Sequence, residues 1–210
     1  YMLGLECCNE HNVGDVQRSI EINIGYLYLD TGMYKEARQY FLSAYARYMA
    51  APENERDISR LTMIYTNLAE SYMLEGDMDN TAQYIDRIEA ECKPHFGEMD
   101  NIYVDSLCAR FYHLIGDAEK RDMYIADLEK RLGGRVLIMD IFGDLYEFCL
   151  LMLELDRDDI VVEIINKIEE PIKKTRIANI KRKYLELKIR LYRRNNCEQK
   201  CIEAMNSFFD

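Results

Sequence analysis

The stretch Asn23–Ala44, NIGYLYLDTGMYKEARQYFLSA, predicts two helices joined by a tight turn. The first helix is expected to end at Gly32, because glycine accepts the left-handed backbone conformation in which many helices terminate. Small or large apolar residues recur with helical spacing on both sides of that turn, at Ile24, Tyr28, Ala37, Phe41 and Ala44. Since Gly25 and Ala37 are small, the two helices can approach each other closely as an antiparallel pair.

A landmark equivalent to Gly25 recurs along the rest of the chain. It stands at Gly25, Ala69, Ala109, Cys149 and Ile189, at intervals of 44, 40, 40 and 40 residues. A fixed period of this size is typical of structural repeats that stack on one another. A plain helical bundle is the alternative, but five landmarks in register favour the stack.

The pattern of the first unit resembles the tetratricopeptide repeat. That signature has a small residue after an apolar one, a tyrosine, a turn glycine, and then alanine, a large apolar residue and alanine, here Ile24-Gly25, Tyr28, Gly32, Ala37, Phe41 and Ala44. The match weakens toward the C-terminal end, and Arg121 stands where alanine is expected. The period exceeds the 34 residues usual for this family, which predicts longer helices.

The resemblance implies an all-α fold, a right-handed α-solenoid of about eleven helices in antiparallel pairs. We expect a single domain with a half repeat at 1–15 and repeats at about 16–54, 55–95, 96–134, 135–171 and 172–210. The connections are expected near Gly14, Gly32, 52–54, Gly76, Pro94, Gly116, 133–134, Asp156, Pro171 and 195–196. Because the chain begins with Tyr1 and still reads as helix near Asp210, we interpret it as a fragment of a longer protein.

The charge distribution is uneven along a chain whose net charge is −11. Between Pro171 and Lys200 there are 11 basic and 2 acidic residues, so the remainder is strongly acidic. The acidic balance argues against a nucleic-acid partner for the whole surface. We expect the basic segment to contact an acidic partner, such as a second copy or a neighbouring domain; a nucleic acid, an anionic lipid or a solvated helix are the alternatives. Its candidate contact residues are Lys181, Arg182, Lys183, Arg190, Arg193 and Arg194.

Seven cysteines occur, an odd number without the spacing of a disulfide framework, which indicates reduced thiols and a cytoplasmic location. Cys197 and Cys201 lie four residues apart, and core packing is the preferred interpretation over a metal or redox pair. Cys92 and His95 are only two potential ligands, so no metal site is predicted. Nor does any stretch resemble a signal peptide or reach the ~20 apolar residues of a membrane span.

The sequence contains no recognisable catalytic motif. It has no phosphate-binding glycine loop, no Gly-x-Ser-x-Gly, no His-Glu-x-x-His and no Cys-x-x-Cys. We therefore expect no enzyme activity and no cofactor in these residues.

The resemblance instead implies action through a concave surface lined by the first helix of each pair. Its candidate binding residues are Tyr26, Asp30, Thr66, Glu70, Tyr103, Ser106, Arg110, His113, Tyr146 and Glu154. Ile22 and Met63 belong to the same predicted surface. Mixed aromatic, methionine and charged side chains suit a peptide or protein segment.

One function of the tetratricopeptide repeat family, the binding of chaperones, is not expected for this chain. The family's chaperone-binding members clamp a carboxylate with lysine and asparagine, but the corresponding positions here are Ile22, Tyr26, Thr66 and Glu70.

The long period instead resembles the N-terminal regions of bacterial signalling proteins. This resemblance implies a sensory or regulatory module, acting as a homodimer or through an attached output domain, with a GGDEF diguanylate cyclase favoured over a histidine kinase or a transcription-activating domain. The alternatives are a standalone interaction scaffold and a transcription regulator that responds to a signalling peptide.

Overall fold

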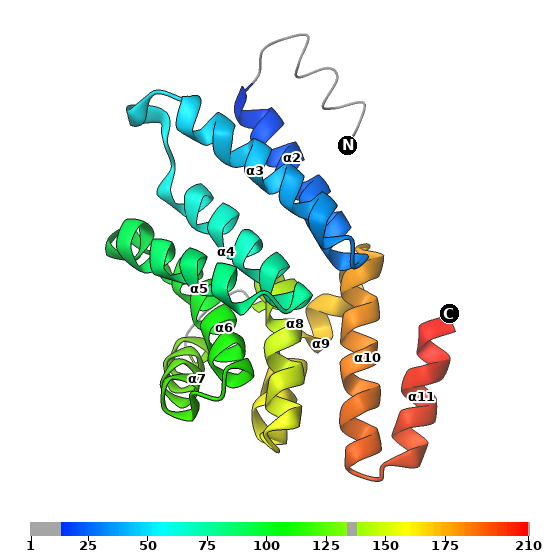
Figure 1. Cartoon of the computed structure of the whole chain (residues 1–210). Coiled ribbons are helices and arrows are strands. Elements are labelled where there is room, and N and C mark those ends of the chain that lie inside the picture. The colour runs from blue at the N-terminus through cyan, green and yellow to red at the C-terminus, as the bar shows by residue number, and fades with distance from the viewer. Residues whose placement is uncertain (1–13, 134–137, 210) are drawn as a thin grey trace. The chain divides into compact units, whose positions relative to one another are not determined.

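The computed structural model describes residues 14–133 and 138–209, and within them it contains only helices and their connections. Ten α-helices lie in these residues: α2 (Gly14–Asp30), α3 (Tyr34–Ala50), α4 (Ile58–Glu75), α5 (Met78–Arg87), α6 (Glu98–Leu114), α7 (Ala118–Leu132), α8 (Ile138–Glu154), α9 (Asp158–Lys174), α10 (Ala178–Arg194) and α11 (Glu198–Phe209) (Figure 1). Short helices η1 (Glu53–Glu55), η2 (Ile88–Cys92) and η3 (Lys93–His95) lie in the connections. The half repeat predicted at 1–15 lies almost wholly outside the described residues, so only the all-α prediction is confirmed.

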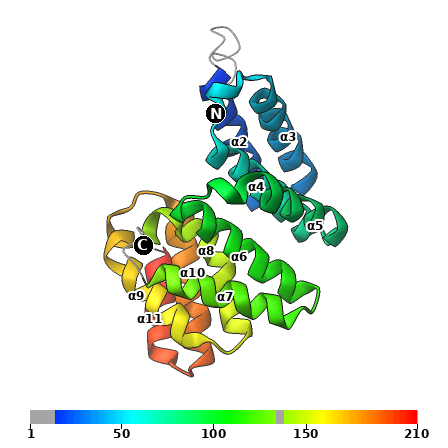
Figure 2. The same cartoon turned by 90° about the vertical axis from the view of Figure 1, so that its left-hand side faces the viewer.

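The helices pair in chain order into antiparallel hairpins, beginning with α2 and α3 and ending with α10 and α11. Both views show this arrangement for α2 with α3 and for α4 with α5 (Figures 1 and 2). Five hairpins share one turn, in which a residue with positive φ follows the first helix. These turn residues are Gly32, Gly76, Gly116, Asp156 and Asn196, with φ of 78°, 87°, 78°, 58° and 52°. In each turn the next backbone N–H donates to a carbonyl five residues earlier, for example Asp77 N to Tyr72 O at 2.9 Å. The connections predicted at these five places are confirmed.

The close approach predicted between α2 and α3 occurs at Gly25. A Cβ atom added at Gly25 would collide with the ring of Phe41, which is fully buried. Ala37 and Ala44 on α3 are fully buried as well. The small residue is therefore required by the distance between the two helices.

Tyrosines join the two helices of three hairpins. Their rings stack as Tyr28 on Tyr40, Tyr72 on Tyr84 and Tyr112 on Tyr124, with centroids 5.5, 5.8 and 5.6 Å apart. In every case the two tyrosines are twelve residues apart in the sequence, one on each side of the turn. Offset stacking of this kind adds to the stabilisation that burial provides.

A polar cluster lies at the edge of the core where α3, α4 and α5 meet, and the half-buried Arg87 and the exposed Glu91 belong to it. The buried Tyr65 donates its hydroxyl hydrogen to Glu91 at 2.9 Å, while Arg87 donates to the hydroxyls of Tyr65 and Tyr45 at 2.6 and 3.0 Å. Burial, together with hydrogen bonds to Tyr45 and Glu91, raises the pKa of Tyr65 above its ordinary value. Glu91 belongs to the π-helical turn η2 that continues α5, a feature which the sequence did not predict.

One predicted connection is wrong. Pro171 lies inside α9, which continues to Lys174, and the chain turns at 175–177 instead. A proline removes one backbone donor, but within the last helical turn this loss is small, and the buried Ile172 anchors the turn against the core. The fifth pair therefore begins at α10 rather than near residue 172.

The chain divides into two compact units, of which the first ends at Phe111 and the second begins at Tyr112, inside α6. Large buried side chains form a core in each unit, including Phe41 and Tyr65 in the first and Phe142 and Phe148 in the second. The stacking of all pairs into one superhelical domain stays a prediction. No helix in the described part of the chain combines the length and apolarity needed to cross a bilayer.

Candidate functional site: a groove on three helices of the first unit

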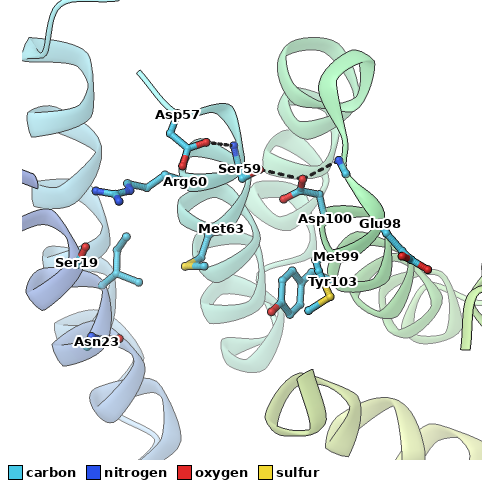
Figure 3. Close-up of a pocket in the computed structure, with 12 residues that line it drawn as sticks. Ser19, Asn23, Asp57, Ser59, Arg60, Met63, Glu98, Met99, Asp100 and Tyr103 are labelled. Carbon is cyan, nitrogen blue, oxygen red and sulfur yellow. Dashed lines mark hydrogen bonds between the residues drawn. The ribbon is translucent and has the colours of Figure 1, made fainter. Parts of the chain in front are cut away.

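A groove with a cavity volume of about 670 Å³ lies in the first unit, on the first helix of three hairpins. Figure 3 shows its lining, which comprises Ser19, Ile22 and Asn23 from α2, Asp57, Ser59, Arg60 and Met63 at the start of α4, and Gly97, Glu98, Met99, Asp100 and Tyr103 at the start of α6. A volume of this size lies within the range that binding sites for small molecules and peptide side chains occupy.

The start of α4 is fastened to the start of α6 by a buried carboxylate. Asp100 accepts a hydrogen bond from the hydroxyl of Ser59 at 3.0 Å and another from the backbone N–H of Gly97 at 2.9 Å (Figure 3). Asp57 caps α4 by accepting from the backbone N–H of Ser59 at 3.0 Å. These bonds hold one wall of the groove in place.

The middle of the groove is apolar. Met63 from α4 lines it together with Met99 and Tyr103 from α6 (Figure 3). Met63 is 42% exposed even though it lies between helices. A flexible, polarisable side chain that water reaches inside a groove is a suitable contact for an apolar side chain of a ligand.

Charged and polar side chains surround this apolar centre. Arg60 extends from α4 toward α2, where Ser19 and Asn23 offer polar groups (Figure 3). The exposed Glu98 begins α6 on the other side. The groove therefore combines an apolar floor with hydrogen-bonding groups and both signs of charge at its edge, which is the composition of a surface for a peptide rather than for an apolar small molecule.

Of the ten predicted concave residues, Tyr103 is the one that lines this cavity; Ile22 and Met63, predicted for the same surface, also do. Ser19 was not among the predicted residues, although the repeat period identifies it. Ser19, Met63 and Tyr103 are 44 and 40 residues apart and so occupy equivalent positions. The polar residues at the starts of α4 and α6 could not be found this way, because they are brought together by the packing of two helix ends.

Several other predicted residues bind one another across neighbouring helices. Arg110 on α6 donates to Glu70 on α4 at 2.8 Å, and both side chains are largely buried. His113 Nε2 lies 3.2 Å from Glu154 Oε1 in the second unit. The structure thus places these four side chains in contacts between adjacent first helices, where they join hairpins to each other.

The remaining predicted residues occupy varied environments. Ser106 and Tyr146 are buried, Tyr26 and Thr66 are half-buried, and Asp30 is exposed. The Thr66 hydroxyl donates to the carbonyl of Thr62 at 2.7 Å. Burial, followed by a hydrogen bond with Glu186, raises the pKa of Tyr146.

The predicted basic patch is partly neutralised within the second unit. Lys183 is buried and donates to the carbonyl of Gly143 at 3.4 Å. Ion pairs bind Arg182 and Arg190 to Glu186, and Arg194 to Asp156 and Asp158. Lys181 and Arg193 are exposed and form no ion pair with the residues described here.

The cysteines within the described residues are free thiols. Cys92, Cys108, Cys149 and Cys201 are buried, and Cys197 is half-buried. Burial raises the pKa of the Cys92 and Cys149 thiols above the ordinary value. Among the side chains that the structure describes, no group of three or more His, Cys, Asp or Glu is arranged to hold a metal ion. Cys7 and Cys8 lie outside these residues.

No protein-family description matches this chain, and neither the curated proteins nor the solved structures contain a significant match to it.

Proposed function

We propose that the chain is a non-catalytic binding module and that the groove between α2, α4 and α6 holds a short peptide or an extended segment of a partner protein. The observation that carries the proposal is that Met63 is exposed although it lies in a groove. Residues of α2, α4 and α6 line this groove, which has an apolar floor and a polar edge. An anchor side chain of the ligand would cover Met63, Met99 and Tyr103 and remove their apolar surface from water.

The test is a selection of displayed peptides against the full chain, followed by calorimetric titration of the recovered peptides. Met63→Asp should weaken binding by at least about tenfold, because it places a charge where an apolar side chain docks. Leu42→Asp is the matched control: Leu42 is 43% exposed in the same unit, on α3, and does not line the groove. Equal loss of binding in both variants, or unchanged binding in Met63→Asp, would refute the proposal.

We propose further, on the tetratricopeptide resemblance, that the hairpins stack into a right-handed solenoid and that the module acts in the cytoplasm as the regulatory region of a bacterial signalling protein. The shared turn in five hairpins supports the first part of this proposal. A GGDEF diguanylate cyclase domain is the favoured output. The sequence of the gene beyond the codon for residue 210 tests this: an output domain in the same reading frame supports a sensor, whereas an immediate stop codon leaves a scaffold or a peptide-responsive regulator.

A further inference from the structure

The hairpin of α10 and α11 lacks a ring that three other hairpins have. Tyr28, Tyr72 and Tyr112 each stack on a tyrosine twelve residues later. Tyr192 is their equivalent on α10, but the residue twelve positions later is Ala204. A methyl group thus replaces a phenol ring between these two helices, and no other ring stacks on Tyr192 among the side chains that the structure describes.

A cavity of about 310 Å³ is present at this place. Tyr192 and Ala204 both line it, together with Leu185, Lys188, Lys200 and Glu203. Ala204 is buried, so the cavity reaches the contact surface of α11 with α10. The space therefore lies beside one aromatic ring, at the position where the related hairpins hold a second ring.

Two ammonium groups lie near the Tyr192 ring. Lys188 Nζ is 5.8 Å and Lys200 Nζ 5.9 Å from the ring centroid. Lys188 also donates to the Tyr184 hydroxyl and to Glu169, both at 3.3 Å. Burial alone would lower the pKa of Lys188, but its interactions with Tyr184 and Tyr192 and its hydrogen bond with Glu169 raise the pKa above the ordinary value.

In the hairpin of α6 and α7, a second tyrosine fills the position that corresponds to the cavity. There Lys120, the equivalent of Lys200, lies 4.8 Å from the centroid of Tyr112, which stacks on Tyr124. In the α10–α11 hairpin Lys200 forms no ion pair within the described part of the chain. Glu203 is exposed and accepts a hydrogen bond from Gln199. Lys188 is already paired with Glu169, so Lys200 is the lysine of the cavity whose charge no carboxylate neutralises within the described part of the chain.

We propose that this cavity binds a planar aromatic ring that carries an anionic group. The ring stacks on Tyr192 in the place of the missing tyrosine, and the anion lies between Lys188 and Lys200. Stacking supplies the shape preference and the two ammonium groups supply the charge preference. This site lies on different helices from the groove of the first unit and does not depend on it.

Phenyl phosphate tests the proposal, with cyclohexyl phosphate as a probe of equal charge without an aromatic ring. Both are titrated into the full chain and followed by calorimetry and ligand-observed NMR. We expect phenyl phosphate to bind at least about threefold more tightly than cyclohexyl phosphate, the difference that stacking provides. Equal binding of the two probes, or no binding of phenyl phosphate, would overturn the proposal.

Variants distinguish binding in this cavity from nonspecific binding of the anion to basic side chains. Ala204→Tyr should refill the cavity, abolish binding and raise the thermal midpoint of the free chain. Lys200→Gln should weaken binding by about threefold or more, whereas Lys181→Gln, an exposed lysine of α10 outside the cavity, should leave it unchanged. If Ala204→Tyr does not fold, Ala204→Leu fills the same space with less volume. Undiminished binding in a folded Ala204 variant, or equal loss in the two lysine variants, would contradict the site.

Discussion

Gly25 shows how one residue sets the distance between two helices. Its α-carbon faces the ring of Phe41, and an added Cβ would collide with that ring. Because Phe41 is fully buried, the ring has no free space into which it can move. Gly25, the first of the residues that define the repeat period, is therefore required for steric reasons.

We predict that Gly25→Ala lowers the free energy of unfolding by about 1–3 kcal/mol, the usual effect of overpacking a core. Alanine is the better helix former by about 1 kcal/mol, so a net destabilisation shows that the collision outweighs propensity. Urea denaturation followed by circular dichroism measures the difference.

Gly133→Ala is the control for this prediction. Gly133 ends α7 with a φ of −67°, and a Cβ there would meet nothing nearer than 3.5 Å. Its unfolding free energy should change by no more than about 0.5 kcal/mol. A Gly25→Ala variant as stable as Gly133→Ala would mean that α2 and α3 are farther apart than the structure places them.

At the scale of the element, the ion pair of Glu70 and Arg110 joins α4 to α6. Glu70 and Arg110 have side chains that are 15% and 11% exposed, and they lie 2.8 Å apart. A pair with this degree of burial is costly to break singly, because the remaining charge keeps its desolvation penalty.

We predict that Arg110→Met destabilises the chain by about 2 kcal/mol and that adding Glu70→Met recovers most of the loss. A double-mutant cycle on urea denaturation measures the coupling. Lys173→Met is the control, because Lys173 and Glu170 form a pair that is 60% and 73% exposed, and no measurable change in the denaturation midpoint is expected. Additive effects of the Glu70 and Arg110 substitutions would show that the two side chains do not interact.

Element boundaries followed local chemistry in most cases. The turns at Gly76 and Gly116 were predictable because glycine tolerates positive φ, and the following residues Asp77 and Asp117 cap the next helix. The end of α9 was not predictable from Pro171, because the burial of Ile172 carries the helix past the proline. Local signals thus mark a helix end unless a core contact overrides them.

At the scale of the whole molecule, the reactivity of the cysteine thiols indicates how well the two cores exclude solvent. Four of the five cysteines in the described residues are buried, and Cys197 is half-buried. A buried thiol reacts only when the surrounding structure opens, whereas a partly exposed thiol reacts without opening.

We predict that N-ethylmaleimide modifies Cys197 at least about tenfold faster than Cys92, Cys108, Cys149 or Cys201 under native conditions. Peptide mass spectrometry of timed samples measures each rate, and labelling in 6 M guanidinium provides the unprotected reference. Cys149 reacting as fast as Cys197 would show that the core of the second unit is open.

The sequence by itself determined the all-helical fold and the five shared turns, because these depend on residues within one or two helical turns: a positive-φ residue, a cap and a spaced apolar face. Only the tertiary structure decided which polar side chains meet. Three such contacts join residues about forty positions apart in the sequence. They are the hydrogen bonds of Arg110 with Glu70, of Ser59 with Asp100 and of the buried Lys183 with the carbonyl of Gly143. Such contacts depend on how each helix is rotated against its neighbour, and the many side chains in the interface determine that rotation together.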